Sequence, residues 1–161
     1  MPVTDVTIDP DTRTITITAH FAAPVERVWA LYADPRQLEK VWGPPTHPAT
    51  FVDHALEPGG RMTYYMTGPE WERYGGWWEV TEVDAPRRFS FRDGFADDDL
   101  RPVEDMPVSV STYTFEEADG GTRAVYVSVY DSAEALQQVV DMGVQEGATG
   151  ALNQIDDLLA A

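Results

Sequence analysis

The chain has 161 residues, no cysteine and a formal charge of −17, from 28 acidic and 11 basic residues. This length is typical of one domain, here residues 1–161. Without cysteine the chain can form neither a disulfide framework nor a thiolate metal site. The negative field repels phosphate backbones and anionic lipids, so we expect no nucleic-acid or membrane partner. No apolar run approaches the roughly 20 residues that span a bilayer, and the N-terminus has no secretory pattern, so a cytoplasmic protein is expected.

The hydrophobic period changes from strand to helix early in the chain. Residues 13–21, RTITITAHF, alternate polar and apolar side chains and predict a half-buried strand. Residues 23–42 have helical spacing and predict two short helices, separated at ADP because a residue before proline avoids the helical region. The second helix ends where Gly43 and two prolines follow Trp42. Trp42 should therefore close one mouth of the fold, as a fixed plug or as a mobile lid.

Six further strands and one long helix are predicted after residue 49. The strands are TFVDHAL, RMTYYMTG, GGWWEVTEV and FSFRDGF and, after an acidic loop at 96–107, the hairpin VSVSTYTF and TRAVYVSVY. The last helix covers about 131–159, with Asp131 and Glu134 in the spacing of a capping box. This order predicts the α+β class, with a curved antiparallel sheet of six to seven strands around the C-terminal helix.

No motif of known catalytic chemistry is found in the sequence. His20, His47 and His54 lack metal-ligand spacing, so no metal site is expected, and no cofactor is expected either. Glu146 could act as an acid or base if it faced an apolar cavity, which would raise its pKa, but at the helix shoulder it would lie in water. His54 leaves the same alternatives, with the outward orientation favoured. Enzyme activity stays open, leaning toward none, and no catalytic residue is assigned.

Large aromatic and methionine side chains are concentrated on the strand faces that should point at the last helix. The centre of that helix carries glycine and alanine, so the pattern indicates a hollow for a small apolar or aromatic ligand, with plain core packing as the alternative. The predicted lining comprises Trp29, Trp42, Phe51, Met62, Tyr64, Met66, Trp78, Phe89, Phe91 and Tyr113, together with Val144, Glu146, Gly147, Ala148 and Ala151.

Three stretches resemble the SRPBCC or START-like superfamily. They are FAAPVERVWALYADPRQLEKVWGPP, LEPGGRMTYYMTGPEWERYGGWWEVTEVDAPRRFSF and MGVQEGATGALNQIDDLL, and the resemblance extends over about 14–159. More closely, they are similar to bacterial proteins that resemble the C-terminal domain of activators of the Hsp90 chaperone ATPase. The resemblance implies a helix-grip (START/Bet v-like) fold with an apolar cavity. It also implies a chaperone or another protein as an alternative partner, in a monomer or homodimer.

Two positions depart from the sequences that this chain resembles. Val41 stands where relatives usually carry the first of two tryptophans, and Ala148 stands where they usually carry a tryptophan after EG. Loss of a buried side chain of that size costs about 3–5 kcal/mol unless the space is refilled. Either a neighbouring tryptophan (Trp29, Trp77 or Trp78) refills it, or the hollow is larger than usual.

Overall fold

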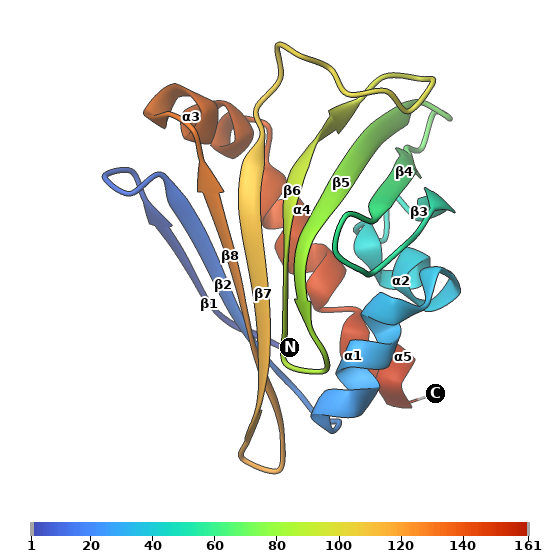
Figure 1. The fold of residues 1–161 in the computed structure, drawn as a ribbon, viewed down its shortest axis with the longest axis vertical. Helices are drawn as coiled ribbons and strands as arrows, with labels where there is room; N and C mark the ends of the chain where they lie inside the picture. Colours follow the sequence, from blue (N-terminus) through green and yellow to red (C-terminus); the bar gives the residue numbers. More distant parts are fainter. Residues whose placement is uncertain (1, 161) are drawn as a thin grey trace.

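Eight antiparallel strands form one sheet in the computed structural model, which describes residues 2–160 (Figure 1). Their order across the sheet is β1-β2-β8-β7-β6-β5-β4-β3. The strands are β1 (Val3–Asp9), β2 (Thr14–Phe21), β3 (Ala49–Asp53), β4 (Arg61–Thr67), β5 (Arg73–Asp84), β6 (Arg88–Ala96), β7 (Ser109–Ala118) and β8 (Gly121–Tyr130). The predicted α+β class and helix-grip fold are confirmed.

The edge strand β1 is absent from the sequence-based prediction of six to seven strands. All its residues between Val3 and Asp9 are exposed, so it has no apolar face that alternation could reveal. It is held by its pairing with β2, in which Val6 lies opposite Ile17. The Val3 backbone N–H also donates to the Asn153 side chain at 3.0 Å, which ties the start of the chain to its C-terminal helices.

The predicted long C-terminal helix is broken into three helices. They are α3 (Ala133–Asp141), α4 (Val144–Leu152) and α5 (Ile155–Ala160). The first break falls at Gly143, whose φ of 78° is a left-handed conformation that glycine adopts at little cost. The N-cap of α3 is Ser132, which accepts a hydrogen bond from the Ala135 N–H at 3.1 Å, so the predicted capping box at Asp131 is wrong by one residue.

Two short helices, α1 (Val25–Ala33) and α2 (Pro35–Trp42), lie between β2 and β3 as predicted. Asp34 separates them and caps α2, because its carboxylate accepts the Arg36 backbone N–H at 2.9 Å. The side chain of Gln154, after α4, donates to the Gly43 carbonyl at 2.7 Å. The turn that follows Trp42 is therefore fastened to the C-terminal helices.

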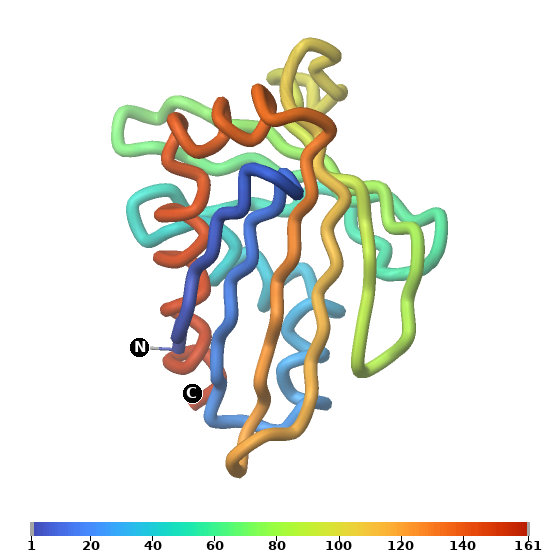
Figure 2. Tube along the Cα trace, turned by 90° about the vertical axis from the view of Figure 1, so that its left-hand side faces the viewer, coloured from blue at the N-terminus to red at the C-terminus, as the bar shows by residue number. Residues whose placement is uncertain are grey.

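The main core lies between the concave face of the sheet and the helices. Strand β2 shows the pattern plainly, with Ile15, Ile17, Ala19 and Phe21 buried and the residues between them half-buried. Figure 2 shows α3 crossing the upper edge of the sheet, while α4 and α5 descend along one side of it, where α4 contacts β1. Within residues 2–160, no helix has the length and apolar character that crossing a bilayer requires.

Candidate functional site

A row of polar side chains crosses the concave face of the sheet. In the strand register, Asp93 of β6 lies opposite Trp78 of β5 on one side and Ser109 of β7 on the other. Ser109 in turn lies opposite Tyr130 of β8. Paired residues of neighbouring strands point to the same face of a sheet, so the four side chains lie together beneath the helices.

A chain of hydroxyl groups lies next to Asp93 on β7 and β8. The Ser109 and Ser111 hydroxyls are 3.0 Å apart, and the Ser111 and Ser128 hydroxyls are 2.9 Å apart. Ser109 and Ser111 are buried, and Ser128 is half-buried. Each hydroxyl can donate one hydrogen bond and accept others, so the chain satisfies these groups within the protein.

The Asp93 carboxyl group has no compensating partner within the described residues, 2–160. Burial alone raises its pKa to about 7, and neither a hydrogen bond nor a neighbouring charge offsets it. Protein atoms surround the side chain, yet it keeps accessible area and is only half-buried, as is Tyr113. Burial also raises the pKa values of Tyr64, Tyr113 and Tyr130, and the nearby Asp93 raises them further. The concave face around Asp93 is therefore surrounded by protein but not fully filled by side chains.

An aromatic wall stands on the β5 side of Asp93. The rings of Trp78 and Phe91 stack with centroids 4.0 Å apart, and Trp42 packs edge-on against Trp78 at 4.8 Å. The indole N–H groups of Trp42 and Trp78 are buried without a hydrogen-bond partner. Trp42 is half-buried and packs as a plug against this wall; whether it also moves as a lid stays a prediction.

Part of the predicted lining is filled core. Phe89 is fully buried, and Trp29, Tyr32 and Tyr113 pack around it with ring centroids 5.2 to 5.7 Å away. Phe115 packs against the same group, and the Tyr32 and Tyr126 hydroxyls share a hydrogen bond of 2.8 Å. Rings therefore occupy the α1 end of the concave face, and Trp29 and Phe89 contribute to packing there.

The other predicted lining residues fall into three groups. Fully or nearly fully buried on the concave face are Phe51, Met62, Tyr64, Trp78 and Phe91. Partly or fully buried against the core are Trp42, Met66, Tyr113, Val144, Ala148 and Ala151, and Gly147 of α4 is half-buried beside them in sequence. Glu146 is exposed and accepts a hydrogen bond from the Gln145 side chain at 3.1 Å, so the expectation that it lines the hollow is corrected. Of the two alternatives for Glu146, the structure shows the one in which its side chain lies in water.

The three tryptophans proposed to refill the space beside Ala148 lie in different parts of the structure. Trp77 lies on the outer face of the sheet, against Gly94 and 5.6 Å from the Arg92 guanidinium group. Trp78 stays on the sheet, stacked on Phe91. Neither Trp77 nor Trp29, whose neighbours are at the α1 end, refills the region of Ala148.

Sequence reasoning missed the polar half of the site, namely Asp93, Ser109, Ser111, Ser128 and Tyr130. The signal for Asp93 was available, because strand alternation places it on the same face as Phe89 and Phe91. The serines carried no such signal, since isolated serines on strands occur on either face. Their convergence depends on the register of β6, β7 and β8. Among residues 2–160, no group of three or more potential metal ligands comes together.

Two glycines differ in the room beside them, and we expect opposite effects of alanine at these positions. A Cβ atom at Gly147 of α4 would meet nothing within 4 Å, so Gly147→Ala should stabilise the protein by about 0.5–1 kcal/mol through helix propensity. At Gly76 of β5 a Cβ atom would overlap the buried Tyr64 ring, and Gly76→Ala should destabilise by about 1–3 kcal/mol. Urea unfolding of both variants measures the two changes, and a destabilised Gly147→Ala protein would contradict the open space.

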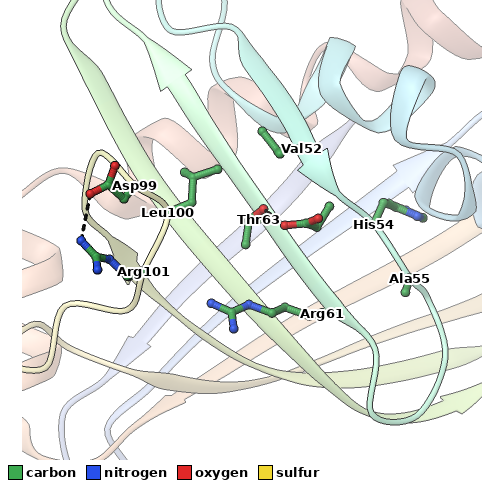
Figure 3. A pocket seen from close by; sticks show the side chains of 9 residues that line it. Val52, His54, Ala55, Arg61, Thr63, Asp99, Leu100 and Arg101 are labelled. Carbon is green, nitrogen blue, oxygen red and sulfur yellow. Dashed lines mark hydrogen bonds and ion pairs between the residues drawn. The ribbon is translucent and has the colours of Figure 1, made fainter.

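An outer pocket of about 580 Å³ lies on the other side of strands β3 and β4 (Figure 3). Four of its polar residues are paired: Thr63 donates to Asp53 at 2.6 Å, and Arg101 pairs with Asp99 at 2.8 Å. His54 is half-buried at its rim, where a ring nitrogen meets the Tyr32 carbonyl at 2.9 Å. Most acidic groups of the outer pocket are paired, whereas Asp93 is not, so the concave face around Asp93 is the better candidate site.

The family of the chain follows from comparison with known proteins. The model of the family described as "Activator of Hsp90 ATPase homolog 1-like protein" matches residues 22–160. The chain belongs to this AHSA1 family. The expected superfamily is therefore confirmed. No curated protein matches this AHSA1-family chain.

Solved structures agree with the fold of this AHSA1-family protein. The protein Ms6760 from Mycobacterium smegmatis is 70% identical, with a TM-score of 0.92 over 98% of this chain and 97% of that one. A protein from Arthrobacter aurescens is 43% identical, with a TM-score of 0.93 over 98% and 92% of the two chains. An AHSA1 protein from Silicibacter pomeroyi is 24% identical with a TM-score of 0.72, over 91% and 97%, and shows the common fold alone.

Proposed function

We propose that this AHSA1-family protein binds a small, largely apolar molecule between the concave face of its sheet and α4. The observation that carries the proposal is the accessible area left on Asp93 and Tyr113 although protein surrounds both. Native interiors are close-packed, so room beside a buried acid requires a reason. A ligand that fills the room supplies one. We also propose a cytoplasmic location.

The walls of the site suit an apolar ligand with a few polar atoms. Tyr113 supplies a half-buried aromatic ring that is backed by the fully buried Trp78 and Phe91, and α4 carries Gly147, which has no side chain, and Ala148. Burial of apolar area contributes about 25 cal/mol per Å², so burying 200 Å² of ligand would contribute roughly 5 kcal/mol before the cost of association. Polar groups on the sheet would fix the orientation of the ligand.

A titration with small aromatic compounds tests the proposal. We expect saturable quenching or a shift of tryptophan emission, because Trp42 and Trp78 stand beside the site, together with a rise in melting temperature. Ala148→Trp should fill the room and weaken binding about 10-fold or more. Ala133→Trp, at an exposed alanine of α3, is the matched control and should leave affinity unchanged. Absence of any response from the whole panel would refute the proposal.

The family description favours interaction with a chaperone ATPase as a second candidate. The match covers residues 22–160, and the charge of −17 would attract a basic surface. Co-purification with an Hsp90-type chaperone and a change in its ATPase rate would support this candidate. Unchanged ATPase rates at saturating concentrations of this protein would argue against it.

A further inference from the structure

The Asp93 carboxylate is the negative charge in the site, and no positively charged group among residues 2–160 pairs with it. No ion pair found among residues 2–160 includes Asp93, although six other ion pairs are present. Every lysine and arginine is exposed except Arg27, which is half-buried and donates to Gln37 at 2.7 Å between α1 and α2. Arg92 is adjacent to Asp93 in sequence but lies on the outer face. An ionised Asp93 therefore has no positively charged partner among residues 2–160, and a cationic ligand could supply one.

The neighbouring hydroxyl groups do not compensate Asp93 either. Ser109, Ser111 and Ser128 bond to one another, and the Tyr130 phenol interacts with Ser109. A carboxylate accepts hydrogen bonds at both oxygens, so Asp93 has unused acceptor capacity directed into the open part of the site. A ligand that donates hydrogen bonds would satisfy it.

The surroundings favour a donor that is also positively charged. Trp78 lies opposite Asp93 in the strand register, Phe91 lies two residues before Asp93 on the same face, and Tyr113 is half-buried nearby. An aromatic ring attracts a cation that lies over its face. The net charge of −17 adds a field that draws cations toward the protein. An anionic ligand would meet a buried like charge and the same unfavourable field. The Asp93 carboxylate, the aromatic rings and the net charge of the protein therefore all favour a positively charged ligand.

We propose that the ligand of this site is an apolar molecule carrying a protonated amine, which donates to Asp93 while its apolar part packs against the half-buried Tyr113. The proposal rests on the proposed function and names its ligand class. Asp93 acts as the specificity-determining residue, because a charge-assisted hydrogen bond is stronger than a neutral one and is stronger still in a partly dry site.

The pH dependence of binding follows from the ionisation of Asp93, whose pKa is about 7. The titratable groups that face it are the phenols of Tyr64, Tyr113 and Tyr130, which burial keeps neutral. The acidic residues of the covering helices α3 and α4, namely Glu134, Asp141 and Glu146, are exposed. An amine should therefore bind more tightly as pH rises from 6 to 8, by up to about 10-fold, because the carboxylate form becomes populated.

The experiment uses three probes that share one ring: phenethylamine, 2-phenylethanol and phenylacetate. Calorimetric titration at pH 8 should give the amine an affinity at least about 10-fold above that of the alcohol, with the acid weakest. Asp93→Asn keeps the shape of the side chain and should bring amine and alcohol to within about 3-fold of each other. The pH series on the unaltered protein gives an independent readout if this variant fails to fold.

The outcomes separate this inference from the proposed function. Equal affinities for amine and alcohol, or amine binding that is independent of pH, would overturn the choice of an amine and leave apolar binding standing. Preference for phenylacetate would overturn it too, by showing that protonated Asp93 donates to an acid. If none of the three probes and no member of the aromatic panel binds, the proposed function itself fails.

Discussion

Replacing Trp78 with alanine is expected to lower the free energy of unfolding by about 3–5 kcal/mol. The side chain is fully buried at the centre of β5. It stacks on Phe91 and also contacts Trp42 and Phe89. Removing it takes away both the apolar burial and these ring contacts, and the surrounding sheet cannot close the gap. Urea unfolding followed by far-ultraviolet circular dichroism measures the loss without relying on tryptophan emission.

Trp71→Ala supplies the matched control for this change. Trp71 lies in the β4–β5 connection and is 85% exposed, so its removal should change the free energy of unfolding by less than about 0.5 kcal/mol. The two variants lose the same side chain from the same chain. If Trp78→Ala destabilised the protein no more than Trp71→Ala, the packing described for the aromatic wall would be wrong.

Asp93→Asn is expected to stabilise the protein at pH 8 by roughly 2–4 kcal/mol. The pKa of Asp93 rises from 3.8 to about 7 on folding. The folded protein therefore binds this proton more tightly than the unfolded chain does. Stability is retained below pH 4 and is lost as pH rises through 7, where the buried carboxylate must ionise. An asparagine cannot ionise, so the variant avoids this loss while retaining a small cost for its buried amide.

Unfolding free energies at pH 4.5, 6 and 8 test this expectation. The difference between Asp93→Asn and the unaltered protein should grow with pH and level off above the pKa of about 7. Asp105→Asn, an exposed change of the same chemistry, corrects for the general effect of removing one of 28 acidic residues. A pH-independent difference would mean that Asp93 ionises freely and lies in water.

The fold could be predicted from the sequence because most elements have a strong local signal. Strand alternation, Pro24 at the start of α1 and the turn at Gly43 all correspond to observed elements. The missing strand β1 and the prediction of one unbroken C-terminal helix were errors with physical causes. Strand β1 has no buried face, so its existence depends on hydrogen bonds to β2. The break at Gly143 interrupts a helix whose apolar spacing continues across it, and spacing alone does not show a left-handed residue.

The candidate site was only half predictable. Its apolar wall follows from alternation, which places Trp78 and Phe91 on one face. Its polar half depends on register between strands, which brings Asp93 beside Ser109 and Ser109 beside Tyr130. Glu146 was chosen because it neighbours an apolar stripe, but its position on the helix turns it outward. The acid that faces the site is Asp93 on the sheet. Its carboxylate lies among aromatic residues and has no stabilising partner among residues 2–160.

The division of the C-terminal segment into α3, α4 and α5 changes the energetic cost of opening the site for a ligand. An unbroken helix would have to be displaced as one body, together with its tethers at Val3 and Gly43. Here the break at Gly143 separates the nine residues of α4, which contact β1 and β2, from α3, which contacts β8. Admitting a ligand beneath α4 would therefore disturb the contacts of α4 with β1 and β2, while the contact of α3 with β8 could stay in place.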